Sequence, residues 1–244
     1  MKNKKVLMVT GASSDVGMGL IRKIQSNYTH IIAHYNRSKD RVQALEHELE
    51  GRVVPMQCDF ADKDAVDALA QQIIDLDIVP THFVHMPNSP LNNAKFNKMQ
   101  WHDFEDEMYT SFRSAVILLQ SFVPAMVKQK NGKVVFMLSY CLVNTPQIKF
   151  AVQYTCAKYA LLGLMRGLST EYAHKGITVN GVSPSMIETR YLKDVHALIV
   201  QKNAAESPLK RNLYVDDVIG AFEFFLSEGA NCITGQNIAV TGGK

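Results

Sequence analysis

The sequence predicts an α/β fold, in which a single doubly wound parallel sheet carries helices on both faces. Short apolar segments alternate with longer helical segments through most of the 244 residues. A glycine-rich turn, GASSDVGMG, follows the first apolar segment and precedes a helix. Polar residues come directly after several predicted strands, where ligands of doubly wound sheets bind. The length suits one domain with a large core.

Composition excludes several classes of protein. The net charge is +3, from 26 basic and 23 acidic residues, and no long basic run marks a nucleic-acid interface. The apolar stretch after MKNKK is too short for a signal peptide, and no run reaches the ~18 apolar residues of a membrane helix. The four cysteines lack CxxC spacing, which favours reduced thiols in a cytoplasmic protein without a metal site (Cys58, Cys141, Cys156, Cys232).

The first predicted unit is a strand at 5–10, a glycine-rich turn and a helix at 17–26. Gly11 permits the tight turn, while Ser13 and Ser14 offer hydroxyl and backbone N–H groups. The helix N-terminus favours a pyrophosphate. This arrangement is typical of a Rossmann-type dinucleotide site, although a purely structural turn would have the same pattern.

The second predicted strand, 30–34, leads into Asn36, Arg37 and Ser38, and a helix follows at 39–49. An acidic residue at the end of this strand would hold the ribose hydroxyl of NAD, but none precedes Asp40. Arg37 suits a 2′-phosphate instead. We therefore predict NADP rather than NAD; the alternative is a solvated arginine at a helix start.

The third and fourth predicted strands lie at 52–57 and 81–86. Asp59, after the third strand, could receive the adenine amino group or could cap the helix predicted at 62–76. The loop PNSPLNN follows the fourth strand, and we expect it to pass over the ribose and nicotinamide.

A long helix predicted at 104–129 is apolar on several faces, which suggests packing on the sheet and on another subunit. The strand at 133–138 then delivers Ser139. In the next helix, 154–174, Tyr154 and Lys158 lie one turn apart, so the cation should lower the phenol pKa for proton transfer to a carbonyl held by Ser139. Such a Tyr–Lys pair alone is common on helices.

The rest of the chain supplies two more strands, 177–182 and 237–240, and a helix at 215–227. We interpret residues 186–211 as a substrate lid, with an ordinary surface insertion as the alternative. A small-residue stripe on helix 154–174 allows a close approach to a neighbouring element or subunit (Ala157, Ala160, Gly163, Gly167).

Together these motifs resemble the short-chain dehydrogenase/reductase family, most closely its 3-oxoacyl-[acyl-carrier-protein] reductases. The residues that carry the resemblance are the turn TGASS with Gly17, then Ser139, Tyr154-x-x-x-Lys158, and TVNGVSP followed by Thr189. It covers nearly the whole chain and implies one NAD(P)-binding domain over 1–244.

The resemblance also implies roles. Tyr154 would give its proton to the carbonyl oxygen, Lys158 would lower the tyrosine pKa and hold the nicotinamide ribose, and Ser139 would bind the substrate oxygen. NADPH would supply the hydride. The implied cofactor-binding residues are Gly11, Ser13, Ser14, Val16, Gly17, Asn36, Arg37, Ser38, Asp59, Phe60, Pro87, Pro184, Ile187 and Thr189, with Tyr154 and Lys158.

Several positions depart from the family pattern. Asp15 replaces a glycine and would repel phosphates unless it points to solvent. The usual Asn-Asn-Ala-Gly loop is His85-Met86-Pro87-Asn88, and Ser185 follows Pro184 where a glycine is usual. Ser111 stands where the family has the asparagine of its proton relay, and as a catalytic residue it could still help organise a water chain, with a shorter reach. The separation of Ser139 from Tyr154 is two residues longer than usual.

Three functions remain open at this stage. The first is reduction of a 3-oxoacyl thioester on an acyl carrier protein, with docking through lysines at the ends of the two long helices or, alternatively, merely solvated lysines there (Lys128, Lys130, Lys133, Lys175). The second is reduction of a free small-molecule ketone. The third is a degenerate partner subunit. The long helices suggest a homodimer or homotetramer.

Overall fold

The computed structural model describes residues 5–90, 92–143 and 149–244. Seven parallel strands form one sheet in the order β3-β2-β1-β4-β5-β6-β7. They are β1 (Val6–Thr10), β2 (His30–Tyr35), β3 (Val53–Gln57), β4 (His82–His85), β5 (Gly132–Met137), β6 (Ile177–Pro184) and β7 (Asn237–Val240). The order reverses between β1 and β4, so the predicted doubly wound α/β sheet is confirmed.

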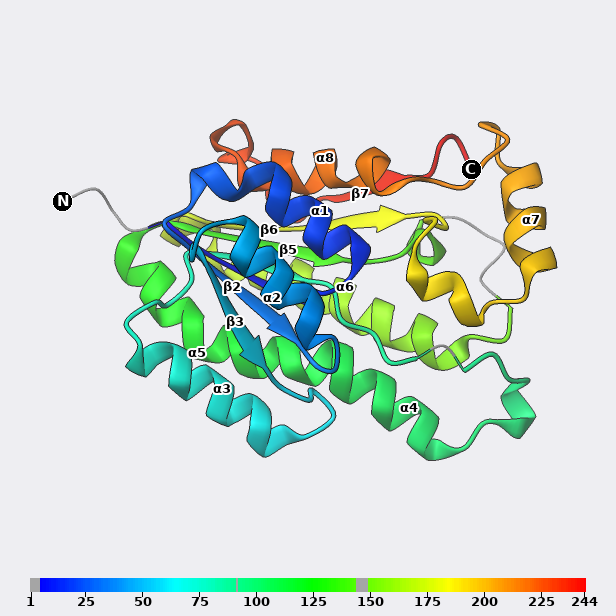
Figure 1. Cartoon of the computed structure of the whole chain (residues 1–244), viewed down its shortest axis with the longest axis horizontal. Helices are drawn as coiled ribbons and strands as arrows, with labels where there is room; N and C mark the ends of the chain where they lie inside the picture. The colour runs from blue at the N-terminus through cyan, green and yellow to red at the C-terminus, as the bar shows by residue number, and fades with distance from the viewer. Residues whose placement is uncertain (1–4, 91, 144–148) are drawn as a thin grey trace.

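Helices cover both faces of the sheet (Figure 1). One face carries α1 (Asp15–Ile24), α2 (Lys39–Glu48) and α8 (Val215–Leu226). The other carries α3 (Lys63–Asp75), α5 (Ser114–Gln129) and α6 (Val152–Tyr172). Alternate residues of β1 enter the two cores: Leu7 and Val9 pack under the first layer, and Val6 and Met8 under the second.

The predicted helix 104–129 is one helical stretch with an irregular start. It consists of α4 (Trp101–Glu107), a π-helical turn η3 (Met108–Arg113) and α5, so it begins three residues earlier than predicted. The π turn was not predicted, and such turns often mark functional sites. The stretch Trp101–Gln129 has a mean hydropathy of 1.3 and could cross a membrane by length and composition alone. It packs on α3 and α6, as the core helix of a globular domain does.

Other boundaries shift by a few residues. Helix α1 begins at Asp15 rather than 17, because the Ser14 side chain accepts a hydrogen bond from the Gly17 amide and caps it. The predicted lid region holds η6 (Arg190–Asp194) and α7 (Ala197–Glu206), which lie beyond the carboxyl ends of the strands (Figure 1). The lengthened loop between Ser139 and Tyr154 includes residues 144–148, which lie outside the described residues.

Candidate active site

The sequence-predicted residues gather at the carboxyl edge of the sheet. Gly11 follows β1, Pro87 follows β4, Ser139 follows β5 and Pro184 ends β6. The neighbouring strands β1 and β4 are the switch point, where doubly wound sheets bind ligands. The edge therefore brings the glycine-rich turn and the Ser–Tyr–Lys residues into one region.

The glycine-rich turn is built for a close approach of backbone segments. Gly11 has a φ of +73°, which disfavours any side chain. A Cβ on Gly17 would lie 2.8 Å from the Gly11 carbonyl oxygen and 2.9 Å from the Ala12 Cα, so the helix could not pack on the turn. The N-terminus of α1 consequently faces the carboxyl edge, as an anion site requires.

Asp15 does not point freely to solvent. Its Oδ1 lies 2.7 Å from Arg41 Nη2 and 3.4 Å from Arg190 Nε, and its Oδ2 accepts the Arg190 backbone N–H at 2.7 Å. The Arg190 guanidinium also donates to the Ser13 carbonyl oxygen at 3.2 Å. The carboxylate at this unusual position is thus neutralised by two arginines, and it attaches the predicted lid to the turn.

The predicted 2′-phosphate residues follow β2. Asn36 and Arg37 are exposed and Ser38 is half-buried, so all three are accessible to a ligand. Arg41, one turn into α2, was not predicted. Its Nη1 is buried and has no hydrogen-bond partner in the described part of the chain. It is a second free donor next to Arg37.

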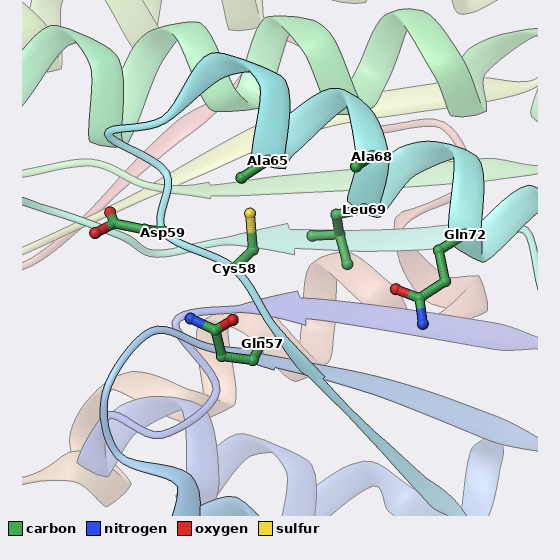
Figure 2. A pocket seen from close by; sticks show the side chains of 7 residues that line it. All are labelled: Gln57, Cys58, Asp59, Ala65, Ala68, Leu69 and Gln72. Carbon is green, nitrogen blue, oxygen red and sulfur yellow. The ribbon is translucent and has the colours of Figure 1, made fainter.

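A groove of about 340 Å³ runs between the end of β3 and α3 (Figure 2). Its lining residues are Gln57, Cys58, Asp59, Ala65, Ala68, Leu69 and Gln72. Asp59 Oδ1 accepts the Ala61 amide at 3.0 Å, whereas Asp62 caps α3. The alternative role of Asp59 as the cap of α3 is therefore excluded. The Phe60 side chain is core, so only its backbone can face a ligand.

Two buried histidines, missed by the sequence reasoning, hold the ends of the strands. His34 Nδ1 accepts the Gly11 amide at 3.2 Å, and its Nε2 donates to the Cys58 carbonyl at 3.0 Å. His85 Nδ1 is 2.8 Å from Thr10 Oγ1, and its Nε2 donates to the Ser111 carbonyl at 2.7 Å. Burial lowers their pKa values to about 4 and about 3, so both rings are neutral.

The three predicted catalytic side chains meet after β5. Ser139, 3% exposed, is hydrogen-bonded to the Tyr154 phenol. The Lys158 ammonium lies 5.4 Å from the centre of the Tyr154 ring and donates to the Met137 carbonyl at 2.8 Å. Lys158 is fully buried and retains further N–H donors for a ligand.

The expectation that Lys158 lowers the Tyr154 pKa was wrong for this structure. Burial raises the pKa of Tyr154, and the hydrogen bond from Ser139 opposes that effect. Lys158 does not reverse this shift: its ammonium lies over the Tyr154 ring, 5.4 Å from the ring centre, and donates to the Met137 carbonyl. Burial also lowers the pKa of Lys158 to about 8.

Ser111 lies in the π turn and is fully buried. Its hydroxyl donates to the Glu107 carbonyl at 2.9 Å, and its own carbonyl is taken by His85. A serine has one O–H donor. Ser111 therefore has no proton left to donate to a water chain, and its predicted relay role stays a prediction.

Glu107 was also missed, because a single glutamate in a helix has no recognisable pattern. It is 2% exposed, and its Oε2 accepts the Ser89 amide at 3.2 Å and the Ser89 hydroxyl. Its Oε1 is buried without a hydrogen-bond partner among the described residues. Burial raises the pKa of Glu107, while Ser89 and the charge of Lys158 oppose that shift.

The remaining predicted cofactor residues lie along the same edge. Pro184 and Val16 are buried, and Pro87 and Ile187 are half-buried. The Thr189 hydroxyl contacts the Ile187 carbonyl at 3.4 Å at the start of η6.

The predicted docking lysines lie elsewhere. Lys128, Lys130 and Lys175 are exposed near the starts of β5 and β6, at the opposite edge of the sheet from Tyr154. Lys133 is not a docking residue, because it is 4% exposed and its ammonium donates to Asn231 Oδ1 at 2.7 Å.

Comparisons with known proteins agree with this geometry. A family model described as enoyl-(acyl carrier protein) reductase matches residues 11–244. The chain belongs to the short-chain dehydrogenase/reductase family. This confirms the resemblance expected from the sequence, including its closest type, the 3-oxoacyl-[acyl-carrier-protein] reductases.

Among curated members of the family, the FabG 3-oxoacyl-[acyl-carrier-protein] reductase of Buchnera aphidicola is 27% identical, covering 99% of this chain and 97% of that protein. The Staphylococcus aureus enzyme is 25% identical, and the match covers 100% of this chain and 99% of that protein. Among solved structures, ElxO with NADP bound has a TM-score of 0.86 at 22% identity, covering 98% of each chain. A 3-oxoacyl reductase of Agrobacterium tumefaciens with NADP bound has a TM-score of 0.88 at 21% identity, covering 98% and 94%.

Proposed function

We propose that the chain is an NADPH-dependent ketoreductase that reduces a carbonyl to a hydroxyl, with Tyr154 as general acid. The observation that carries this proposal is the cluster of Ser139, Tyr154 and Lys158 at the same sheet edge as the glycine-rich turn. Two solved relatives are titled as NADP-bound. The intact cluster argues against a degenerate partner subunit.

The residues present fit NADPH. Gly17 lets α1 pack directly on the backbone of the turn, where an added Cβ would lie 2.8 Å from the Gly11 carbonyl oxygen, and the helix N-terminus there suits a pyrophosphate. Near the end of β2, Arg41 Nη1, which has no partner among the residues that the structure describes, and the exposed Arg37 suit a 2′-phosphate. The Asp59 groove would take the adenine, and Lys158 the nicotinamide ribose. When bound, NADPH supplies the hydride.

The side chains of the protein supply the proton and determine when it is transferred. Ser139 holds the substrate oxygen next to the phenol, which fixes the distance over which the proton moves. The raised pKa keeps Tyr154 protonated until negative charge develops on the carbonyl oxygen. Lys158 then stabilises the phenolate left behind. Residues 186–211 act as a lid, since Tyr191 contacts the Ser89 carbonyl at 3.3 Å and Arg190 contacts Asp15.

The substrate is a 3-oxoacyl thioester on acyl carrier protein, as the names of the curated relatives suggest. Carrier docking involves Lys128, Lys130 and Lys175 at the opposite edge of the sheet. The six residues of β5 separate that edge from the Tyr154 edge by about 20 Å. A carrier protein bound there would deliver its substrate to the active site of another subunit in a cytoplasmic homo-oligomer. The stripe on α6 fits such assembly, because added Cβ atoms on Gly163 and Gly167 meet no atom within 4 Å.

One assay tests the chemistry. NADPH oxidation is followed with an acetoacetyl thioester on carrier protein and with the free ketone. Tyr154→Phe should lose at least ~10²-fold in turnover, at the low end for general acid catalysis. Wild-type rates in this variant would refute the assignment. Equal rates on both substrates would favour a free small-molecule ketone, and absence of nucleotide binding by the wild type would favour the degenerate subunit.

A further inference from the structure

The turn that carries Ser111 also carries an acidic group. Glu107 ends α4 one helical turn before Ser111, and the Ser111 hydroxyl bonds its backbone carbonyl at 2.9 Å. Both α4 and the π turn pack against α6, the helix of Tyr154 and Lys158. Ser111 directs its own donor into the helix, whereas Glu107, directly before the π turn, keeps a buried carboxylate oxygen without a partner among the described residues.

Two opposite charges are buried in this packing. Glu107 is 2% exposed and Lys158 is 0% exposed. Charged groups at this depth persist only when they are compensated by opposite charge and hydrogen bonds. Lys158 has the Met137 carbonyl as a neutral acceptor, and the Glu107 charge acts on it through the interior. The charge of each group therefore favours the charged form of the other against the effect of burial.

Glu107 is held in a defined orientation. The Ser89 amide and hydroxyl both donate to Oε2, which leaves Oε1 as a buried acceptor without a partner among the described residues. Ser89 is itself connected to the lid, because the Tyr191 hydroxyl donates to its carbonyl at 3.3 Å. A carboxylate fixed in this way can act as a permanent part of the site.

We propose that Glu107 is a positioning residue: its buried carboxylate is the counter-charge that keeps the Lys158 ammonium charged, while the Met137 carbonyl orients it next to Tyr154. This inference rests on the proposed reductase function and adds a residue to its machinery. The titratable groups that face Glu107 are Lys158 and Tyr154 of α6 and Tyr191 of η6, and Cys141 of η4 acts on Lys158. Of these groups, Lys158 is the one that is cationic when protonated.

The test compares Glu107→Gln with wild type and with Asp106→Asn, an exposed carboxylate on the same helix. Loss of an opposite charge should move the alkaline limb of kcat/KM to lower pH by about 1 unit. Asp106→Asn should leave the limb in place, and Glu107→Asp, which keeps the charge, should leave the limb close to its wild-type position. An unchanged limb in Glu107→Gln, or equal shifts in the Gln and Asp variants, would overturn the proposal.

A second readout does not depend on turnover. NMR titration of isotope-labelled lysine side chains, with Lys158 assigned by comparison with Lys158→Arg, should show the same downward shift in Glu107→Gln. If the wild type reduces no ketone, the function fails while this titration still decides the role of Glu107. Glu107→Met, similar in length and without a polar atom to satisfy, replaces the Gln variant if the latter does not fold; an unchanged Lys158 midpoint there also overturns the proposal.

Discussion

The charged groups at the glycine-rich turn and those at the proton-transfer site, both on the carboxyl edge of the sheet, differ in their exposure to water. At the glycine-rich turn, Asp15 is paired with Arg41 and Arg190, whose side chains are 26% and 59% exposed. At the proton-transfer end, Glu107 and Lys158 are almost completely buried. Water screens the first cluster and can replace its partners, whereas the second must compensate itself. The first can therefore exchange partners when an anion binds, while the second sets pKa values.

The largest expected effect of this contrast is at the buried end. Lys158→Met leaves the Glu107 carboxylate without its counter-charge, and we expect a loss of unfolding free energy of about 3 kcal/mol. Adding Glu107→Met to that variant should recover most of the loss. Urea denaturation of both single variants and the double variant measures the coupling; additive losses would show that the charges do not interact.

Activity at alkaline pH should report the same lysine. Its pKa is lowered to about 8, and a neutral Lys158 no longer stabilises the phenolate. We expect kcat/KM to be level below pH 8 and to fall by about tenfold per pH unit above it. A pH–rate profile under nucleotide concentrations far below saturation measures this limb. A profile that stays level to pH 10 would contradict the assignment.

The buried neutral histidines should make the free energy of unfolding fall at acidic pH. The folded-state pKa values of His34 and His85 are about 4 and about 3, below the 6.5 of an exposed ring. The stability from keeping these rings neutral is complete above pH 6.5 and is lost as the pH falls toward 4, because the unfolded chain binds the extra protons. His85→Gln should reduce this slope by about 1.4 kcal/mol per pH unit. Exposed His174→Gln is the control, and urea denaturation between pH 4 and 7 is the measurement.

The smallest effect is expected at the exposed end. Asp15→Asn should change the unfolding free energy by less than about 1 kcal/mol, because partly exposed ion pairs contribute little. It should also tighten NADPH binding several-fold, since it frees two guanidinium groups for phosphates. Fluorescence titration gives the affinity. Weaker binding would mean that Asp15 organises the turn, and Lys23→Gln, remote from the turn on α1, serves as the control.

The fold was predictable because its signals are local. Apolar runs such as the one before Gly11 mark the strands in the chain itself, and a cap such as Ser14 marks the start of α1. The triad was likewise predictable from Ser139, Tyr154 and Lys158 together, since strand ends and helical spacing place them in one region.

The features that were missed depend on tertiary contacts. The neutral state of His34 follows from its burial, and its ring bridges the Gly11 amide and the Cys58 carbonyl, which lie far from it in sequence. The burial of Glu107 follows from the packing of α4 on α6. The Tyr154 pKa was expected in the wrong direction because helical spacing shows which residues are near, and not where the Lys158 ammonium points.

The aromatic rings of His34, Phe60 and His85, which lie behind the site, form one continuous stack. The ring centres of His34 and Phe60 are 3.9 Å apart, those of Phe60 and His85 are 6.3 Å apart, and the planes differ by 6° and 7°. Each histidine also makes two hydrogen bonds, His34 to the Gly11 amide and the Cys58 carbonyl, and His85 to the Thr10 hydroxyl and the Ser111 carbonyl, so an apolar replacement of either leaves a buried polar group unpaired. In evolution, His34, Phe60 and His85 should change together, and close relatives that keep one of them should keep all three.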